Sequence, residues 1–452
     1  MGNSPEIDYF DLASSVCNNF RKKDRECYIV GGTVRDTFIG KPVKDLDLAT
    51  DATPDEIKDI ASDTGHKTIE VGEQFGTVVM MVEGEPIEIT TFRSEGDYKD
   101  GRRPEYVAFE TDVIEDLSRR DFTMNALAHD PLTDETVDPF GGRKDIENRT
   151  IRAVGNPVER FQEDSLRPVR ACRFSSTLGF GIDRKTKQAM KQTATQVPRV
   201  SRERLTNELM TIMGSEKPSI GLNCLKDSGI LAEVYPELDS LSGVTQPSQF
   251  HRHDVWNHTM EVVDALPANN IKLRLAGLLH DIGKPTTKGY HGRITFREHE
   301  EVGEVMAEEF ARRNKLPKDT REYLKKMVRY HLFPYEDNWR DATLRKFILK
   351  VGEENLDDLI ELRAADLSGG KVDGIKKANQ FRNKIRNRLE DTGSETIEVR
   401  DLVLRGDDVM RIKSIGAGPE VGRYLSALHE RVLENPKLNT KPSLERMLKE
   451  MQ

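Results

Sequence analysis

The sequence has few cysteines, no long apolar run and no N-terminal leader pattern. Its 452 residues include four cysteines, scattered without paired spacing, at Cys17, Cys27, Cys172 and Cys224. We therefore expect neither a disulfide framework nor a structural zinc site. No apolar stretch approaches the roughly 18 residues that a membrane span needs. The opening residues MGNSPEIDYF lack the basic and apolar regions of a secretory signal. These absences favour a soluble enzyme of the reducing cytoplasm with no membrane partner.

The chain as a whole has a net negative charge, but one part of it is basic. The net charge of −9 argues by itself against a nucleic-acid partner. The stretch from Arg143 to Arg204, however, holds 15 basic and 7 acidic residues. A phosphate backbone responds to local basic surface, although most charge runs are solvated helical faces. Charge alone leaves both interpretations open.

The hydrophobic pattern divides the chain into a small α/β part and a long helical part. Strands are predicted over 27–30, 45–49, 76–82 and 86–92, where β-branched residues or period-2 alternation occur. After Gly142 the pattern is helical, and one helix is expected between the N-cap Ser201 and the terminator Gly214. We predict an α+β protein with four domains, at 1–142, 143–245, 246–370 and 371–452.

A Gly-Gly pair and two aspartates mark the first two predicted strands. Gly31 and Gly32 end the first strand, and Asp45 and Asp47 lie in the second. Alternate side chains of a strand share a face, so the two carboxylates point the same way. They repel each other unless a divalent cation neutralises them, and glycines let a triphosphate approach backbone amides. The pattern favours Mg²⁺-dependent nucleotide chemistry over a surface strand with unrelated acids.

Four ordered motifs resemble those of the polymerase-β-like nucleotidyltransferases. They are most similar to the class II tRNA nucleotidyltransferases, which comprise CCA-adding enzymes and bacterial poly(A) polymerases. The motifs are GGTVRD…KDLDLAT, RRDFTMNAL (119–127), DPFGGRKDI (138–146) and EDSLRPVRACRF (163–174). The resemblance covers about residues 27–215. It implies a nucleotidyltransferase head, made of a small mixed sheet with helices, followed by an all-helical neck and tail.

The resemblance also implies roles for individual residues. Asp45 and Asp47 are implied as Mg²⁺ ligands, with Glu88 as a supporting carboxylate. The residues implied to hold the phosphates and ribose of the nucleotide are Gly31, Gly32, Arg35, Arg120, Asp121 and Asn125. The fourth motif adds Arg170 and Arg173 as candidate nucleotide-binding residues.

Asp164 and Arg167 have the chemistry needed to choose a base. At spacing i and i+3 on a helix they share a face. A carboxylate accepts from the exocyclic amine of cytosine or adenine, and a guanidinium donates to the neighbouring ring acceptor. Pro168 leaves the helix start open: it is tolerated if the helix begins near Asp164, and it kinks a helix that begins earlier.

Two segments bear on which nucleotidyltransferase this is. The loop RSEGDYKDGRRPEY (93–106) resembles a loop associated in the family with switching from C to A, which enzymes adding only CC lack. The segment VGEQFGTV (71–78) is more similar to the CCA-adding branch. Neither segment separates CCA-adding from A-adding enzymes.

A His-rich block follows the neck. Its order His…His-Asp…Asp resembles the HD phosphohydrolase superfamily over roughly 250–370. His258, His280, Asp281 and Asp366 match the core pattern as ligands of a divalent transition metal. His299 and His331 resemble the extra histidines of the complete form. A degenerate, purely structural HD domain is the alternative. Near the C-terminus, SIGAGPEVGRYL (414–425) is either an RNA-contacting helix start or a plain turn between helices.

We therefore predict a CCA tRNA nucleotidyltransferase, an enzyme that adds C, C and A to the 3′ end of tRNA without a template. Its substrates would be tRNA, CTP and ATP, with Mg²⁺ as the cofactor. An A-adding enzyme and a poly(A) polymerase are the alternatives within the class. From another class, the HD domain predicts a metal-dependent phosphohydrolase, acting on esters such as 2′,3′-cyclic phosphates at RNA ends. The oligomeric state is left open.

Overall fold

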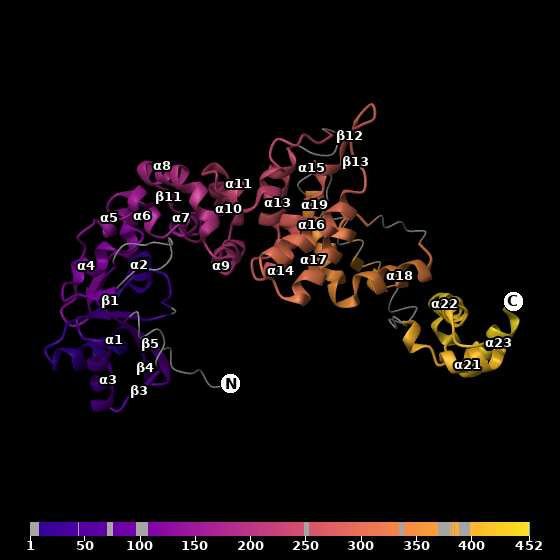
Figure 1. Ribbon diagram of the computed structural model, residues 1–452, viewed down its shortest axis with the longest axis horizontal. Coiled ribbons are helices and arrows are strands. Elements are labelled where there is room, and N and C mark those ends of the chain that lie inside the picture. The colour runs from indigo at the N-terminus through magenta and orange to yellow at the C-terminus, as the bar shows by residue number, and fades with distance from the viewer. Residues whose placement is uncertain are drawn as a thin grey trace. The chain divides into compact units, whose positions relative to one another are not determined.

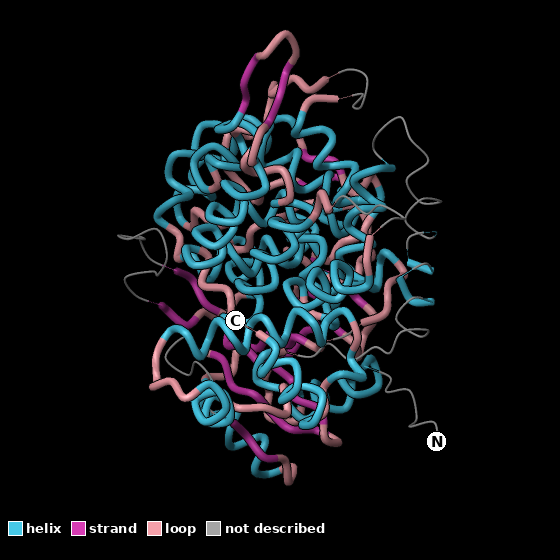
Figure 2. Tube along the Cα trace, turned by 90° about the vertical axis from the view of Figure 1, so that its right-hand side faces the viewer, coloured by secondary structure: helices cyan, strands magenta, loops and turns pink. Residues whose placement is uncertain are grey.

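The chain forms two compact units, Met1–Pro236 and Glu237–Gln452, each described here by itself. The computed structural model describes residues 9–43, 45–69, 76–95, 107–247, 253–333, 339–368, 380, 382–383, 385–387 and 398–451. Within these ranges no helix is long and apolar enough to cross a membrane. Figure 1 labels the elements along the chain, and Figure 2 shows strands and helices in separate colours.

A seven-stranded sheet forms the base of the first unit. Its order is β3-β4-β5-β2-β1-β8-β9, and the pair β2–β5 is parallel whereas the other pairs are antiparallel. The strands are β1 (Cys27–Val30), β2 (Asp47–Thr50), β3 (Lys67–Ile69), β4 (Thr77–Val82), β5 (Glu85–Thr91), β8 (Ala128–Asp130) and β9 (Glu135–Val137). A separate ladder pairs β6 (Arg93–Glu95) with β7 (Val107–Phe109). The predicted mixed sheet is confirmed.

The second predicted strand begins two residues later than expected. Its ladder with β1 starts at Leu48 opposite Ile29, and its ladder with β5 starts at Asp47 opposite Glu88, so neither ladder includes Asp45. Asp45 is instead held by its backbone, because the Thr33 hydroxyl donates to the Asp45 carbonyl at 2.9 Å. The alternation nevertheless extends past the strand end: Leu46 is buried and Asp45 is exposed.

Helices complete the first unit around and beyond the sheet. Those near the sheet are α1 (Tyr9–Arg21), α2 (Gly32–Ile39), α3 (Pro54–Asp63), α4 (Val113–Ser118) and α5 (Gly142–Glu147). Those that follow are α6 (Pro157–Glu163), α7 (Arg167–Leu178), α8 (Arg184–Thr193), α9 (Arg202–Met213), α10 (Pro218–Asp227) and α11 (Ile230–Val234), with a short pair β10 (Thr150–Ile151) and β11 (Gly181–Ile182). Helix α9 confirms the helix predicted between Ser201 and Gly214.

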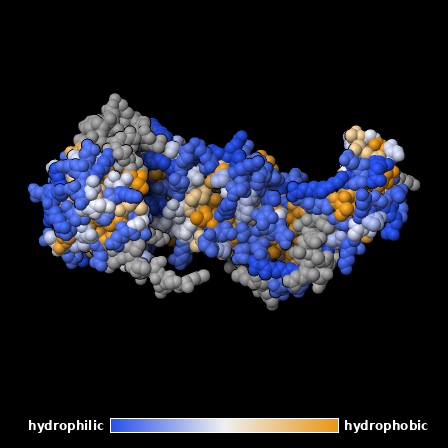
Figure 3. All heavy atoms as spheres, turned by 90° about the horizontal axis from the view of Figure 1, so that it is seen from below, coloured by the Kyte–Doolittle hydropathy of each residue, from blue (hydrophilic) through white to orange (hydrophobic). Residues whose placement is uncertain are grey.

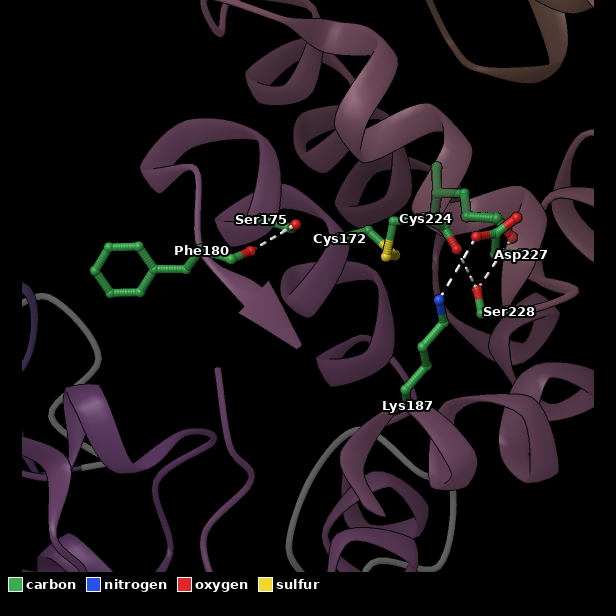
Figure 4. Close-up of a disulfide and its surroundings, with 8 residues drawn as sticks. Cys172, Ser175, Phe180, Lys187, Cys224, Asp227 and Ser228 are labelled. Atoms are coloured by element: carbon green, nitrogen blue, oxygen red, sulfur yellow. Dashed lines mark hydrogen bonds and ion pairs between the residues drawn. A yellow bond between two sulfur atoms is a disulfide. The ribbon is translucent and has the colours of Figure 1, made fainter. Parts of the chain in front are cut away.

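A disulfide joins α7 to α10. The sequence, from which no disulfide framework was expected, did not predict this single crosslink. Cys172 and Cys224 are 52 residues apart in sequence, with Cα atoms 5.3 Å apart (Figure 4), a separation that a disulfide accepts. The helices approach closely because Gly221 faces α7: a Cβ there would lie 3.0 Å from the Ser176 Cβ. Such a pairing depends on helix packing and leaves no spacing signal in the sequence. Cys17 and Cys27 are free thiols.

The second unit is almost entirely helical. Its larger helices are α13 (Val255–Ala265), α14 (Ile271–Leu279), α16 (His299–Arg313), α17 (Lys318–Tyr330), α18 (Asp341–Val351), α19 (Leu356–Ser368), α21 (Gly406–Lys413), α22 (Pro419–Glu434) and α23 (Lys441–Glu450). The short α12 (Pro236–Asp239) and α15 (Lys284–Thr287) and one hairpin, β12 (Lys288–Tyr290) with β13 (Ile294–Phe296), interrupt this pattern. The last three helices share a small core of their own, which includes Leu428 and Leu444. Hydrophilic side chains predominate on the molecular face in Figure 3.

Candidate functional site

The Gly-Gly turn and the two aspartates meet at one edge of the sheet. Gly31 follows β1 with φ +69°, a left-handed conformation that favours glycine, and α2 begins at Gly32. A Cβ on Gly31 would lie 3.0 Å from Nη1 of Arg120 and 3.8 Å from Oδ2 of Asp47. Glycine therefore leaves room for a guanidinium and a carboxylate to approach the same turn.

Asp47 lies in a concentration of negative charge. Its register partner in the neighbouring strand is Glu88, and Asp45 is two residues away. Burial raises the pKa of Asp47, and the charges of Glu88 and Asp45 raise it further, while Arg120 opposes them. A divalent cation would relieve this repulsion, because hard cations prefer carboxylate oxygens. The residues present thus fit a cation held by Asp45 and Asp47.

A cavity of about 550 Å³ opens beside these carboxylates. This size suits a small organic ligand. From the sheet side it is lined by the start of α2, the 41–43 loop, Asp45 and Asp47, and from α7 by Arg173 and Phe174. The first and fourth sequence motifs therefore form one pocket.

Arg35, Asn125, Asp121 and Arg170 form a largely buried chain of hydrogen bonds, which starts at the pocket wall with Arg35. Arg35 donates to the Asn125 side-chain oxygen at 2.7 Å, and the Asn125 amide donates to Asp121 at 2.9 Å. Arg170 donates to the other Asp121 oxygen at 2.8 Å. Burial alone would raise the pKa of Asp121, but the Arg170 charge and these hydrogen bonds outweigh it and lower the pKa to about 2. Asp121 therefore stays ionised and fixes the second motif to α7.

Two residues that the sequence did not single out organise the α7 side. Phe174 stacks with three guanidinium groups, at 3.9 Å for Arg173, 5.1 Å for Arg35 and 5.5 Å for Arg170. Glu208, on α9, pairs with Arg173 at 2.6 Å and with Arg170 at 3.8 Å. Phe174 lies inside the fourth motif, but nothing in the spacing marks it as a stacking centre. Glu208 lies outside all four motifs.

Asp164 and Arg167 do not share a helix face, so that prediction is wrong. Asp164 is extended and follows α6, whereas Arg167 is the first residue of α7, with Pro168 next. The proline ring is tolerated in a first turn but not further inside a helix, and the Asp164 side chain accepts from the Leu166 amide at 3.0 Å.

Both residues also have other partners here. Arg204 of α9 donates to Asp164 at 2.7 Å. Arg167 is buried and donates to Glu163 and to the Arg119 carbonyl. Their side chains are thus held by different neighbours at the junction of α6 and α7. Most of the 93–106 loop, and the residues 71–75 of VGEQFGTV, lie outside the described residues.

The second unit contains a buried cluster of four histidines and two aspartates. Among the described residues, two groups bring their ligand atoms within 4.8 Å of one another: His258, His280 and Asp366, and Asp281, His299 and His331. Asp281 connects the groups, because its carboxylate lies 3.1 Å from His280 Nε2 and 3.4 Å from His299 Nε2. Asp45, Asp47 and Glu88 of the first unit do not form a group that meets this 4.8 Å criterion.

Three rings of the cluster are held in the same manner. The Nδ1 atoms of His280, His299 and His331 lie 2.7 to 2.8 Å from backbone carbonyls three residues earlier. With Nδ1 donating, each Nε2 is a free electron-pair donor directed at the aspartates. Nitrogen and carboxylate donors of this kind fit a divalent transition metal.

Two cations that the sequence did not single out adjoin the cluster. Lys284 contacts Asp281 at 2.6 Å, and Arg363 contacts Asp366 at 2.6 Å. Both follow an i, i+3 spacing, a signal that was available in the sequence. Their positive charges offset part of the negative charge of the two carboxylates.

Three family models match consecutive parts of the chain. The poly A polymerase head domain matches residues 27–152. The probable RNA and SrmB-binding site of polymerase A matches residues 179–241, and the HD domain matches residues 251–368.

Curated relatives match about half of the chain. The CCA-adding enzyme of Geobacillus kaustophilus is 44% identical over 223 residues, which is 49% of this chain and 54% of that protein. That of Geobacillus thermodenitrificans is 44% identical over 267 residues, 57% of this chain and 65% of that protein. The match thus spans about half to two thirds of the length of these relatives.

Solved structures match over nearly the whole length. The structure of the Bacillus stearothermophilus CCA-adding enzyme in complex with CTP covers 98% of both chains, with a TM-score of 0.74 and 29% identity. That of the Thermotoga maritima CCA-adding enzyme complexed with tRNA covers 99% of this chain and 97% of that one, with a TM-score of 0.58 and 19% identity, and shows the fold alone. Taken with the pocket geometry, these matches show that the chain belongs to the class II tRNA nucleotidyltransferase family of CCA-adding enzymes and bacterial poly(A) polymerases, and carries an HD domain.

Proposed function

We propose that the protein adds C, C and A to the 3′ end of tRNA without a template, using CTP and ATP. The observation that carries this proposal is the pocket in which the Asp45 and Asp47 carboxylates face Arg173 and Phe174 of α7. A pocket shared by a metal-binding edge and a basic helix suits a nucleoside triphosphate. The named relatives are CCA-adding enzymes, which supports this substrate class.

Each group of residues around the pocket would have a separate role in nucleotide addition. Asp45 and Asp47 would hold Mg²⁺, which when bound supplies activation of the attacking hydroxyl and charge neutralisation of the leaving pyrophosphate. Arg120 and the amides of the Gly31–Gly32 turn lie where the phosphates would enter. Glu88, opposite Asp47, would support the metal edge. The buried chain from Arg35 to Arg170 would keep the pocket walls in register.

Base choice belongs to the junction of α6 and α7. Asp164 and Arg167 carry the acceptor and donors that distinguish cytosine and adenine from uracil and guanine. Their present partners, Arg204 and Glu163, would orient them for that task. The four domains stay as proposed, with a head at 1–142, a neck at 143–245, an HD domain at 246–370 and a tRNA-binding tail at 371–452.

An extension assay tests this function. Three tRNA transcripts, ending at the discriminator base, at C and at CC, are each incubated with CTP, ATP or both. We expect every transcript to be extended to CCA and no further. A single A placed only on the CC-ending transcript would instead show an A-adding enzyme, and long A tails would show a poly(A) polymerase. No incorporation into any transcript would contradict the proposal.

A second function, metal-dependent phosphoester hydrolysis, is favoured by the His-Asp cluster of the second unit. Its four histidines and two aspartates are all buried, and isolated buried charges are costly unless they are paired or bind metal. A divalent transition metal held there would supply an activated water. We expect hydrolysis of 2′,3′-cyclic phosphates.

Paired variants separate the two activities. Asp45→Ala with Asp47→Ala should abolish nucleotide addition and retain hydrolysis. His280→Ala with Asp281→Ala should do the reverse. Loss of both activities in both double variants, with the fold intact by circular dichroism, would contradict independent sites.

A further inference from the structure

The β12–β13 hairpin adjoins the His-Asp cluster both in sequence and in space. Asp281 lies seven residues before the hairpin and His299 three residues after it. The carbonyl of Phe296, the last residue of β13, lies 2.8 Å from the His299 Nδ1. The Lys284 ammonium lies 5.5 Å from the centre of the Phe296 ring. The base of the hairpin therefore forms part of the wall of the cluster.

The hairpin segment carries a single sign of charge. Residues 282–297 include no aspartate or glutamate, in a chain with net charge −9. They include four cations, Lys284, Lys288, Arg293 and Arg297, and also His291. Four of these five residues are exposed, namely Lys288, His291, Arg293 and Arg297, whereas Lys284 is buried. Such a concentration of positive charge attracts a phosphate backbone.

One face of the hairpin presents aromatic surface. Tyr290 pairs with Ile294, and Lys288 pairs with Phe296, so these four side chains share a face. Tyr290 is 76% exposed, although large apolar surfaces are usually covered. The strands stand away from the helices in both Figure 1 and Figure 2. Gly292, at φ +71°, makes the tight turn at the tip.

We propose that this hairpin binds the single-stranded end of an RNA and leads it to the His-Asp cluster. Bases stack on exposed aromatic rings while cations track the backbone, which is how single strands are bound without sequence preference. A polyanion with aromatic bases satisfies both the charge and the ring, whereas an acidic peptide satisfies the charge alone. That the bound RNA end is a substrate rests on the proposed hydrolase function. Binding of RNA by the hairpin does not require hydrolysis.

Photo-crosslinking to the full-length chain locates the contact. The probe is a 12-nucleotide RNA with 4-thiouridine near its 3′ end, and adducts are mapped by tryptic digestion. We expect an adduct on the tryptic peptide 289–293, which contains Tyr290. Tyr290→Ala should lower RNA binding at the hairpin about tenfold, while Tyr290→Phe keeps the ring and should retain binding.

A charge-matched pair of variants tests the cations. Lys288→Ala with Arg293→Ala should lower the salt dependence of hairpin binding, the slope of log K against log salt, by about 1.4. The control is Lys318→Ala with Lys350→Ala, two exposed lysines of the same unit outside the hairpin. Equal effects of the two pairs, or adducts confined to residues outside 282–297, would overturn the proposal.

Hydrolysis kinetics separate failure of this inference from failure of the hydrolase function. The substrates are an RNA with a 2′,3′-cyclic phosphate end and bis(p-nitrophenyl) phosphate. The hairpin variants should raise the KM for RNA relative to the small ester about tenfold. If neither substrate is cleaved, the hydrolase function fails, and crosslinking alone decides on the hairpin. Cleavage of RNA with an unchanged KM ratio would refute the role of the hairpin.

Discussion

Asp121 is a buried carboxylate of the first unit and Asp47 is a half-buried one, and their surroundings act on them in opposite ways. Asp121 receives hydrogen bonds from Asn125 and Arg170, which lower its pKa. Asp47 faces Glu88 and Asp45, and its pKa is raised. The first arrangement stabilises the fold with an ionised group. The surroundings of Asp47 instead disfavour its ionised form, through burial and repulsion. This is expected of a carboxylate that binds a cation.

Asp47→Asn should remove activity while it stabilises the protein. Because the pKa of Asp47 is raised, the fold favours its protonated form, and the ionised form costs stability at neutral pH. A neutral isostere removes that cost, so we expect the metal-free melting temperature to rise by about 1 to 4 °C. CTP incorporation in a single-turnover assay should fall at least about a hundredfold. Asp55→Asn, at an exposed residue of α3, is the control and should change neither quantity. A lower melting temperature for Asp47→Asn would contradict the argument.

Asp121→Asn should lose stability that depends on pH. The pKa of about 2 lies below the ordinary value of 3.8, so the ionised group stabilises the fold above about pH 4. That contribution is lost as the pH falls from about 4 to about 2. At pH 7 we expect the free energy of unfolding to fall by about 2 kcal/mol. Urea unfolding followed by circular dichroism measures it, and a difference that persists unchanged at pH 2 would show another cause.

At the scale of elements, α7 is the centre of the first unit. It supplies Arg173 and Phe174 to the pocket and Arg170 to the buried chain of hydrogen bonds. Behind it, α9 contributes Glu208, and α10 is joined to it by the disulfide. The position of the pocket wall therefore depends on how firmly α9 and α10 hold α7.

Removal of the disulfide should loosen that hold. Cys224→Ser should lower the free energy of unfolding of the first unit by about 2 to 4 kcal/mol, because the crosslink restricts the unfolded chain. Denaturant unfolding of the oxidised protein, followed by circular dichroism, measures the change. Wild-type protein with a reducing agent should match the variant. If the reducing agent leaves wild-type stability unchanged, the crosslink does not hold the two helices.

Local patterns predicted elements better than they predicted partners. The first strand was predicted over its full range, Cys27–Val30, because three of its four residues are β-branched or aromatic. The second was placed two residues early, because the first residue of a strand depends on where its ladders begin, which the local pattern does not show. Asp164 was expected on a helix with Arg167, but the break before Pro168 separates them. Its partner Arg204 is 40 residues away and leaves no spacing signal.

The whole molecule has two units with different chemistry, and its tryptophans report on only one. Trp256 and Trp339 are the two tryptophans of the chain, and both belong to the second unit. Trp256 is fully buried, two residues before His258. Tryptophan fluorescence therefore follows the unit with the His-Asp cluster, whereas circular dichroism follows both units.

Metal removal should affect the two units unequally. The chelator EDTA should lower the melting temperature seen by tryptophan fluorescence by at least about 4 °C, because a ligand that binds only the folded state stabilises it. Added transition metal should restore it. His331→Ala should remove this response, and an unchanged fluorescence transition would argue against a bound metal. The head should respond less, because Asp45 is exposed and its metal would arrive with the nucleotide.

The hydrogen bonds from the three histidine rings to carbonyls three residues earlier have a further consequence. The rings of His280, His299 and His331 are each oriented by a carbonyl of their own backbone segment. Because these hydrogen bonds do not involve the metal-binding Nε2 atoms, they would persist when an ion leaves, and one ion would exchange for another without the chain unfolding. The identity of the metal in the cell would then follow the current supply of ions, whichever ion was present at synthesis.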